Sequence, residues 1–142
     1  MAFEIVRVGH ERCLALRQQV LWPHFPIEHS YVQGDEHATH YAVITGQLMV
    51  CCLSVFDLGE GLYQIRKFAT LADYQGEGHG TALLTYAIGV THTIGATAIT
   101  LSARESAIGF YEKFGFSARG ERFQRHDVRY VTMLLEFASQ EA

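Results

Sequence analysis

Apolar and polar residues alternate along the chain with two different periods. The period of each segment predicts whether that segment is a strand or a helix. A period of two is typical of half-buried strands, and a period near 3.6 is typical of amphipathic helices. Helical spacing is found at residues 10–21, 81–93 and 102–114. Strand patterns are found at residues 2–8, 40–45, 48–56, 62–71, 96–101, 116–123 and 128–137.

Glycine and proline mark the connections. Gly46 and Gln47 predict a hairpin turn, residues 57–61 predict a second turn, and Pro23 ends the first helix before a long loop. Strand 96–101 is expected to lie parallel to its neighbour because a helix precedes it. The order of elements predicts a mixed α/β sheet with helices on its faces. No linker or repeat is visible, so residues 1–142 are expected to form a single domain.

Composition limits the class of protein. The chain has 142 residues, 49% of them hydrophobic, which is enough for one globular core. A formal charge of -4 argues against a nucleic-acid partner and suits a cationic or amine substrate. The sequence shows neither a leader nor an apolar run long enough for a bilayer, so we expect a cytoplasmic protein without membrane contact.

Cysteine and histidine do not indicate a cofactor site. Three cysteines, two of them adjacent in a predicted strand, are typical of buried thiols in a reducing compartment. His37 and His40 are three residues apart, whereas the other histidines are scattered. Because zinc needs three or four convergent ligands, we expect no metal.

The most informative stretch is the glycine-rich hexapeptide from Gln75 to Gly80, between a predicted strand and a predicted helix. Backbone N–H groups of such a loop and of the helix start bind phosphate. The loop lacks the lysine of a P-loop NTPase after Gly80. A dinucleotide fingerprint fails because Leu83 stands at its third glycine position. An ordinary strand-to-helix turn stays open at this point.

The hexapeptide resembles the Gln/Arg-x-x-Gly-x-Gly/Ala loop of the GNAT acetyltransferases through Gln75, Gly78 and Gly80. Residues 107–116 are similar to a second signature of that family, Ala-x-x-Phe-Tyr-x-Lys-x-Gly-Phe. The resemblance implies a GNAT fold with a splayed parallel strand pair. It also implies an N-acetyltransferase that uses acetyl-CoA and a primary amine acceptor. A non-catalytic acyl-CoA sensor or a protein-interaction module is the alternative.

The resemblance also implies site residues. The loop would bind the pyrophosphate of acetyl-CoA, and the preceding strand would pair with the pantetheine arm and polarise the thioester. A serine stands where relatives often have asparagine, and it could bond the pantetheine or cap a helix. The expected cofactor-binding residues are Phe68, Ala69, Thr70, Gln75, Gly76, Glu77, Gly78, His79, Gly80, Thr81, Ser102 and Tyr111.

Tyr111 resembles the family tyrosine whose phenol protonates the departing thiolate, and it is the expected catalytic residue. Its helical spacing among apolar residues, taken alone, favours a core aromatic residue. The general base is left open among Glu28, Glu60, Glu121 and His126. The sequence also leaves open a homodimer formed through an edge strand.

Overall fold

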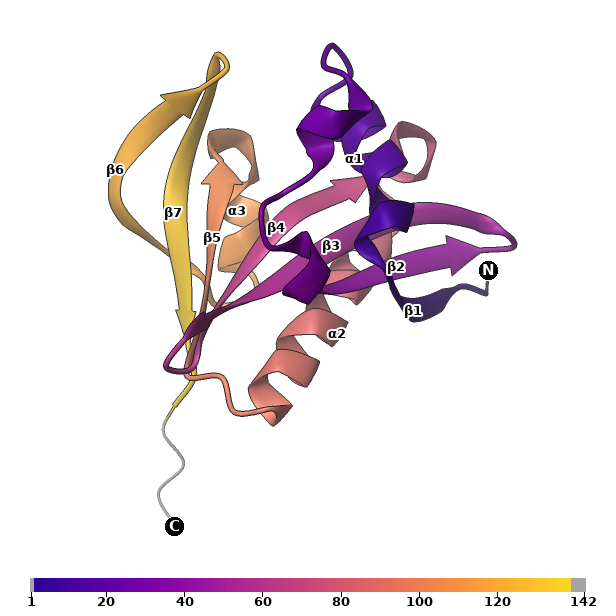
Figure 1. The fold of residues 1–142 in the computed structure, drawn as a ribbon. Coiled ribbons are helices and arrows are strands. Elements are labelled where there is room, and N and C mark those ends of the chain that lie inside the picture. Colours follow the sequence, from indigo (N-terminus) through magenta and orange to yellow (C-terminus); the bar gives the residue numbers. More distant parts are fainter. Residues whose placement is uncertain (1, 139–142) are drawn as a thin grey trace. The chain divides into compact units, whose positions relative to one another are not determined.

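The computed structural model describes residues 2–138, which form a seven-stranded sheet with helices (Figure 1). The α-helices are α1 (Leu14–Leu21), α2 (His79–Thr93) and α3 (Ile108–Glu112). Short 3-10 turns are η1 (His10–Cys13), η2 (Ile27–Ser30), η3 (Asp35–His37), η4 (Ala72–Tyr74) and η5 (Glu105–Ala107). The strands are β1 (Glu4–Val8), β2 (Thr39–Thr45), β3 (Leu48–Gly59), β4 (Leu62–Thr70), β5 (Ala98–Arg104), β6 (Ser117–Arg125) and β7 (Val128–Glu136).

The strands lie in the order β1-β2-β3-β4-β5-β7-β6. β4 and β5 are parallel, with residues 62–64 in register with residues 98–100. The pairs β1–β2, β2–β3, β5–β7 and β6–β7 are antiparallel. This arrangement confirms the predicted mixed α/β sheet, including the parallel strand that follows a helix. The predicted divergence of β4 from β5 stays a prediction.

Contacts along the chain group it into two compact units. The first unit contains the chain up to residue 56 together with residues 65–89. The second contains residues 57–64 and the chain from residue 90 onward. The expectation of a single domain stays a prediction. Among the described residues, no helix is both long and apolar enough to cross a membrane.

In the first unit, α1 and α2 cover opposite faces of the sheet. The buried residues Cys13 of η1 and Leu16 of α1 pack in one cluster with Ala69 of β4. Successive strand residues point to opposite faces, so Phe68 and Thr70 point away from that cluster. Both lie close to Gly80 at the start of α2. The helices predicted on both faces of the sheet are therefore present.

In the second unit, β5 is longer than predicted. The sequence predicts a helix from Ser102, but Ser102 and Arg104 lie in β5, opposite Thr132 and Tyr130 of β7. The prediction was wrong because burial alternates here with period two, and the helix proper begins only at Ile108. Ser102 therefore lies on a strand and caps no helix. The glycine after α3 has φ 98°, as a helix C-cap requires.

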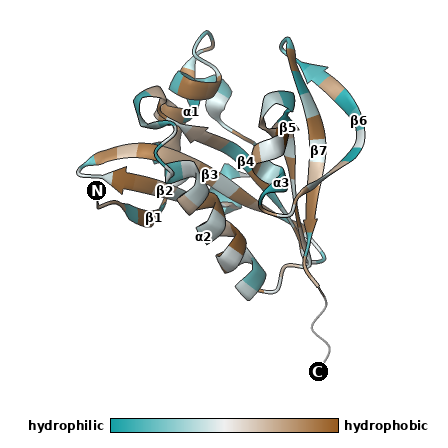
Figure 2. Cartoon of the chain, turned by 180° about the vertical axis from the view of Figure 1, so that it is seen from behind, coloured by the Kyte–Doolittle hydropathy of each residue, from teal (hydrophilic) through white to brown (hydrophobic). Residues whose placement is uncertain are grey.

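β6 forms one edge of the sheet and is largely hydrophilic (Figure 2). Its pairing with β7 shifts register between Arg119 and Phe123. Gly120 lies in this irregular stretch with φ 76°, a conformation that glycine adopts without strain. The hairpin turn at His126 and Asp127 has positive φ at both residues, as in type I′ turns.

A buried ion pair joins α1 to the loop that follows it. Arg17 and Asp35 have side chains that are 0% exposed, and the guanidinium contacts both carboxylate oxygens at 2.7 and 3.0 Å. Arg17 also donates to the carbonyl of Ser30 and to the hydroxyl of Ser54 on β3, both at 2.9 Å. Burial alone would raise the pKa of Asp35, but hydrogen bonds from Arg17 and the amide of Val32 lower it below its ordinary value.

His40 extends this network. Its Nε2 lies 2.8 Å from the carbonyl oxygen of Asp35, which can only accept, so Nε2 carries the proton. Nδ1 of the neutral ring therefore accepts from the Ser54 hydroxyl at 2.6 Å. Burial lowers the pKa of His40, and the charge of Arg17 lowers it further. A proton on Nδ1 would leave the Ser54 hydroxyl without this acceptor and add a second buried cation.

Replacing Arg17 with methionine should destabilise the fold strongly. The variant would leave the carboxylate of Asp35 buried without its partner, and such a loss typically costs about 3–5 kcal/mol. Urea unfolding followed by circular dichroism measures the change in the free energy of unfolding. Arg12→Met, at an exposed residue of η1, is the matched control. A loss below about 1 kcal/mol for Arg17→Met would contradict the interpretation, and adding Asp35→Leu should restore part of the stability.

The free energy of unfolding should fall as the pH drops below about 6.5, the ordinary pKa of histidine. The lowered pKa of His40 means that the unfolded chain binds this proton first, so stability is complete above pH 6.5 and decreases toward the folded pKa. One proton contributes at most about 1.4 kcal/mol per pH unit. Urea unfolding of the native chain and His40→Gln between pH 5 and 8 isolates this contribution. Parallel pH profiles for the two proteins would exclude it.

Candidate functional site

The glycine loop exposes its main chain. Gly76 and Gly78 have φ 79° and 88°, and a Cβ built at either would meet no atom within 4 Å. The first hydrogen bond of α2 runs from the amide of Ala82 to the carbonyl of Gly78 at 3.0 Å. The amides of residues 79–81 precede that bond and are the orphan donors of the helix start. This geometry suits an anion against the backbone.

The end of β4 packs against the start of α2. A Cβ on Gly80 would lie 3.4 Å from Cζ of Phe68 and 3.6 Å from the hydroxyl of Thr70. The side chain of Gln75 donates to the carbonyl of Thr70 at 3.0 Å and ties the loop to the strand. Ala69 is buried and belongs to the cluster under α1. The structure thus brings Phe68, Thr70, Gln75 and Gly80 together, and their role in binding the co-substrate stays a prediction.

The side chains of the loop point in different directions. His79 is buried, and its ring lies against Phe3 and Tyr74, with centroids 5.3 and 6.0 Å away. Its Nε2 is 3.6 Å from a carboxylate oxygen of Glu77. Thr81 is exposed, and its carbonyl accepts from the hydroxyl of Thr85 at 2.7 Å. The contact of the His79 ring with Phe3 thus holds the loop beside the residues that precede β1. The backbone of the loop stays exposed.

Ser102 and Tyr111 belong to the second unit. Ser102 is exposed on β5, on the face opposite the buried Leu101 and Ala103. Tyr111 is half-buried in α3, and its ring contacts Phe116 at a centroid distance of 5.9 Å. Its carbonyl accepts from the amides of residues 114 and 116. Tyr111 therefore has a packing role in this unit beside the catalytic role that the sequence predicts.

The four candidate bases share one property, which is exposure. Glu28 lies in η2, Glu60 in the turn after β3, Glu121 on β6 and His126 in the β6–β7 turn. Exposure does not separate them, so the identity of the general base stays open.

The cysteines are all buried and free. Burial raises the pKa of Cys51 to about 11, so its sulfur is a protonated thiol at neutral pH and a poor acyl carrier.

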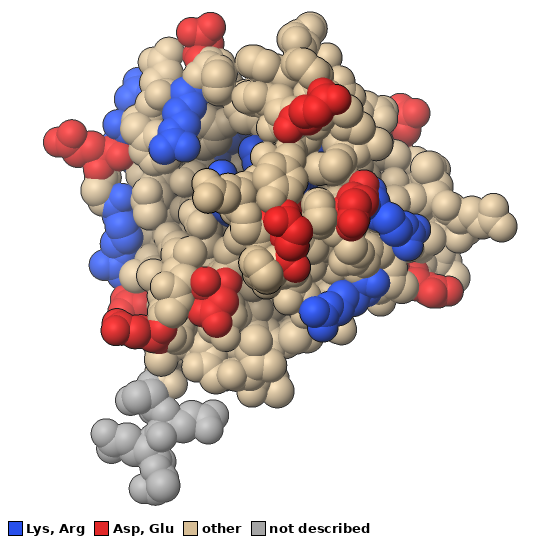
Figure 3. All heavy atoms as spheres, in the orientation of Figure 1, with Lys and Arg blue, Asp and Glu red and all other residues tan. Residues whose placement is uncertain are grey.

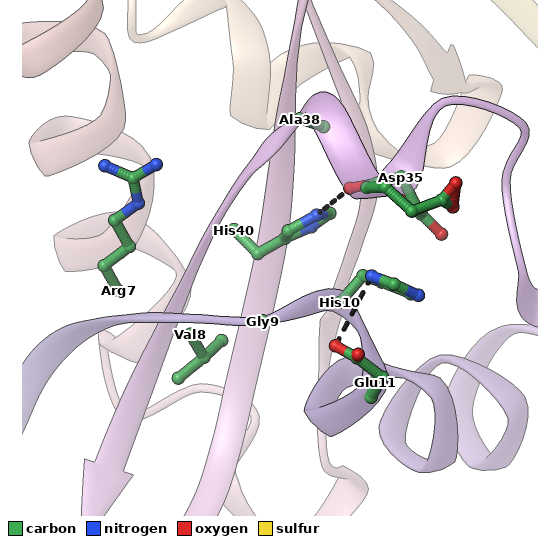
Figure 4. Close-up of a pocket in the computed structure, with 9 residues that line it drawn as sticks. Arg7, Val8, Gly9, His10, Glu11, Asp35, Ala38 and His40 are labelled. Carbon is green, nitrogen blue, oxygen red and sulfur yellow. Dashed lines mark hydrogen bonds and ion pairs between the residues drawn. The ribbon is translucent and has the colours of Figure 1, made fainter.

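Sequence reasoning missed a pocket of about 470 Å³ in the first unit (Figure 4). His10 and His40 both line it, with ring centroids 6.1 Å apart and ring planes tilted by 50°. Glu11 lies 3.4 Å from His10. Close by, Tyr31 donates to the carboxylate of Glu36, and this hydrogen bond raises the pKa of Tyr31. The pocket brings η1 and η3 together, and no local motif marks that contact.

The open glycine loop at a helix start, on a mixed sheet with one parallel pair, provides a backbone site for an anionic group such as a pyrophosphate. The chain belongs to the acetyltransferase (GNAT) domain family, whose family model matches residues 29–137. Acetyl-CoA is accordingly its co-substrate, and the two open glycines and three orphan amides fit a pyrophosphate. Among residues 2–138 there is no cluster of three His, Cys, Asp or Glu that could hold a metal ion.

Known proteins agree with this assignment. The chain is 27% identical to the "Uncharacterized N-acetyltransferase YitI" of Bacillus subtilis, covering 92% of this chain and 96% of that protein. The ribosomal-protein-S18-alanine N-acetyltransferase of Escherichia coli has the same fold, with TM-score 0.80, 18% identity and coverage of 99% and 97%. A GNAT acetyltransferase of Elizabethkingia anophelis with acetyl-CoA bound gives TM-score 0.71 at 14% identity, with coverage of 95% and 98%.

Closing the open space at Gly78 should abolish acetyl-CoA binding. A tryptophan would fill the space in front of the backbone amides, so affinity should fall at least about a hundredfold. Gly78→Ala is the matched control, because it carries the same backbone strain at φ 88° without the bulk. Calorimetric titration with acetyl-CoA measures both, and circular dichroism checks folding. Equal affinity of the tryptophan variant and the native chain would remove the loop from the site.

Proposed function

We propose that the chain transfers the acetyl group of acetyl-CoA directly to a primary amine. The observation that carries the proposal is the open backbone of the glycine loop at the start of α2, where Gly76 and Gly78 have positive φ and a built Cβ would meet no atom within 4 Å. Such a loop holds a pyrophosphate without any side chain and leaves the reactive end of the co-substrate to other residues.

The proposed reaction is a single displacement. The amine nitrogen attacks the thioester carbonyl carbon, the C–S bond breaks, and coenzyme A leaves as a thiolate that takes up a proton. The amine loses a proton, and the product is an amide. The buried, protonated thiol of Cys51 supports this direct route over an acyl-enzyme, since a nucleophilic cysteine needs an accessible thiolate.

Three groups would assist this reaction. The backbone of β4 at residues 68–70 would pair with the pantetheine arm, and an N–H there would polarise the thioester carbonyl. Ser102, exposed on β5, would bond a pantetheine carbonyl. Tyr111 would donate a proton to the departing sulfur. Its contact with Phe116 supports this role, because a packed ring holds its hydroxyl in one place.

Tyr111→Phe should lower kcat by about a hundredfold, which is the lower end of the range for general acid catalysis. The KM for acetyl-CoA should change little, because the ring and its packing are kept. Steady-state kinetics with thiol detection over an amine panel measures both constants. Tyr86→Phe, at an exposed tyrosine of α2, is the matched control. An unchanged kcat would exclude Tyr111 as the acid, and acetyl-CoA binding without turnover of any amine would favour the sensor function.

A further inference from the structure

Strands β5 and β7 have one buried face and one open face. On β5 and β7 the residues that alternate inward are Leu101, Ala103, Val131 and Met133, each at most 3% exposed. The residues between them point to the other face and are exposed or half-buried. This open face carries Ser102, Arg104, Tyr130 and Thr132.

One row across the open face combines aromatic rings with guanidinium groups. Arg104 of β5 lies opposite Tyr130 of β7, which lies opposite Phe123 of β6. Residues directly opposite each other point to the same face of a sheet. The rings of Phe123 and Tyr130 stack at 5.7 Å and 20°. The guanidinium carbon of Arg125 lies 5.4 Å from the Phe123 ring centroid. We call these four residues the arginine–aromatic surface.

Among the described residues, no carboxylate forms an ion pair with the arginines of this surface. The other arginines of the hairpin have carboxylate partners, with Arg122 at 3.1 Å and Arg129 at 3.8 Å from Glu105, and Arg119 at 3.0 Å from Glu136. Within residues 2–138, neither Arg104 nor Arg125 has such a partner. Figure 3 shows Lys and Arg side chains over the β6–β7 hairpin, with Asp and Glu between them. Two unpaired guanidiniums beside stacked rings complement a ligand with an anionic group and an apolar body.

The arginine–aromatic surface lies next to a predicted co-substrate contact. Ser102 and Arg104 are two residues apart on β5 and point to the same face. Their Cα atoms are therefore about 7 Å apart. Under the proposed function, Ser102 bonds the pantetheine arm. A group bound by Arg104 would then lie two residues further along β5. An acceptor that carries both an amine and an acid would place its acid on this row, beside the co-substrate contact.

We propose that the arginine–aromatic surface binds the carboxylate of the amine acceptor, with the body of the acceptor against Phe123 and Tyr130. This inference rests on the proposed function and names the substrate class as carboxylate-bearing primary amines, such as amino acids. Arginine contacts a planar carboxylate through two parallel hydrogen bonds, which gives geometric selection as well as attraction.

The first test is binding, which needs no turnover. N-acetyl-L-phenylalanine and uncharged N-acetylphenethylamine differ only in the carboxylate, and amide chemical shifts report where each binds. The charged ligand should bind about tenfold more tightly or better, as expected for charge-assisted hydrogen bonds, and shift residues of β5, β6 and β7. Equal affinities, or shifts outside these strands, would overturn the inference.

The second test changes the arginines. Arg104→Gln and Arg125→Gln should each reduce the preference for the charged ligand by several fold, and the double variant should remove it. Arg122→Gln is the matched control, because that arginine lies on the same hairpin but pairs with Glu105. A preference that survives in the double variant would contradict the assignment. Tighter binding of O-phosphoethanolamine than of either N-acetyl ligand would replace the carboxylate by a phosphate.

Turnover separates this inference from the proposed function. L-phenylalanine and L-tyrosine should be acetylated with a lower KM than phenethylamine and tyramine, and Arg104→Gln should raise only the KM of the amino acids. Acetylation without that difference would overturn the carboxylate site and leave the acetyltransferase intact. Carboxylate binding at the surface without acetylation of any amine would support the site and overturn the proposed reaction. The affinity for acetyl-CoA should be the same in Arg104→Gln and the native chain.

Discussion

The first unit depends on the buried ion pair between Arg17 and Asp35. The guanidinium uses four hydrogen bonds to join α1, the loop after it and β3. The backbone hydrogen bonds of that loop run between its own residues in short 3-10 turns, so the ion pair adds a buried link from the loop to α1 and β3. Removing two charges from water is expensive, and an apolar pair could give equal stability. The pair is therefore best understood as selecting one loop conformation among many.

The hydrogen bonds of the ion pair continue to His40 and fix its protonation pattern as well. The ionised carboxylate of Asp35 accepts from Arg17 and from the amide of Val32, and the backbone carbonyl of Asp35 fixes the tautomer of His40. The Ser54 hydroxyl then has one orientation, accepting from Arg17 and donating to His40. Each member of the network has its proton position fixed by its neighbours. The walls of the pocket near η3 are rigid for the same reason.

Local patterns explain what the sequence could predict. Strands and helices follow from periods of a few residues, and the phosphate loop follows from glycines within a single turn. The same logic fails for Arg17, since a helical arginine usually points to water. Its burial depends on Asp35 and Ser54, which are distant in sequence. The strand at Ser102 was missed for another reason, because a helical signature close downstream outweighed the alternation of Leu101 and Ala103.

The glycine loop and the arginine–aromatic surface differ in how far the sequence could predict them. A loop that binds through its backbone requires closely spaced glycines, and these form a pattern that is visible in the sequence. A surface that acts through side chains from three strands leaves none, since Arg104, Phe123 and Tyr130 become neighbours only through the strand register. The proposed acceptor contact therefore depends on the pairing of strands, whereas the co-substrate loop depends on consecutive residues.

The bulge in β6 has a consequence for the behaviour of the protein at high concentration. An edge strand normally offers a row of unpaired N–H and C=O groups to any other chain. In β6 the register shift before Phe123 and the turn of Gly120 interrupt that row, and charged side chains flank it. At the opposite edge, β1 has only five residues. Both edges of the sheet therefore resist pairing with strands of other chains. The register shift protects β6, and the short length protects β1.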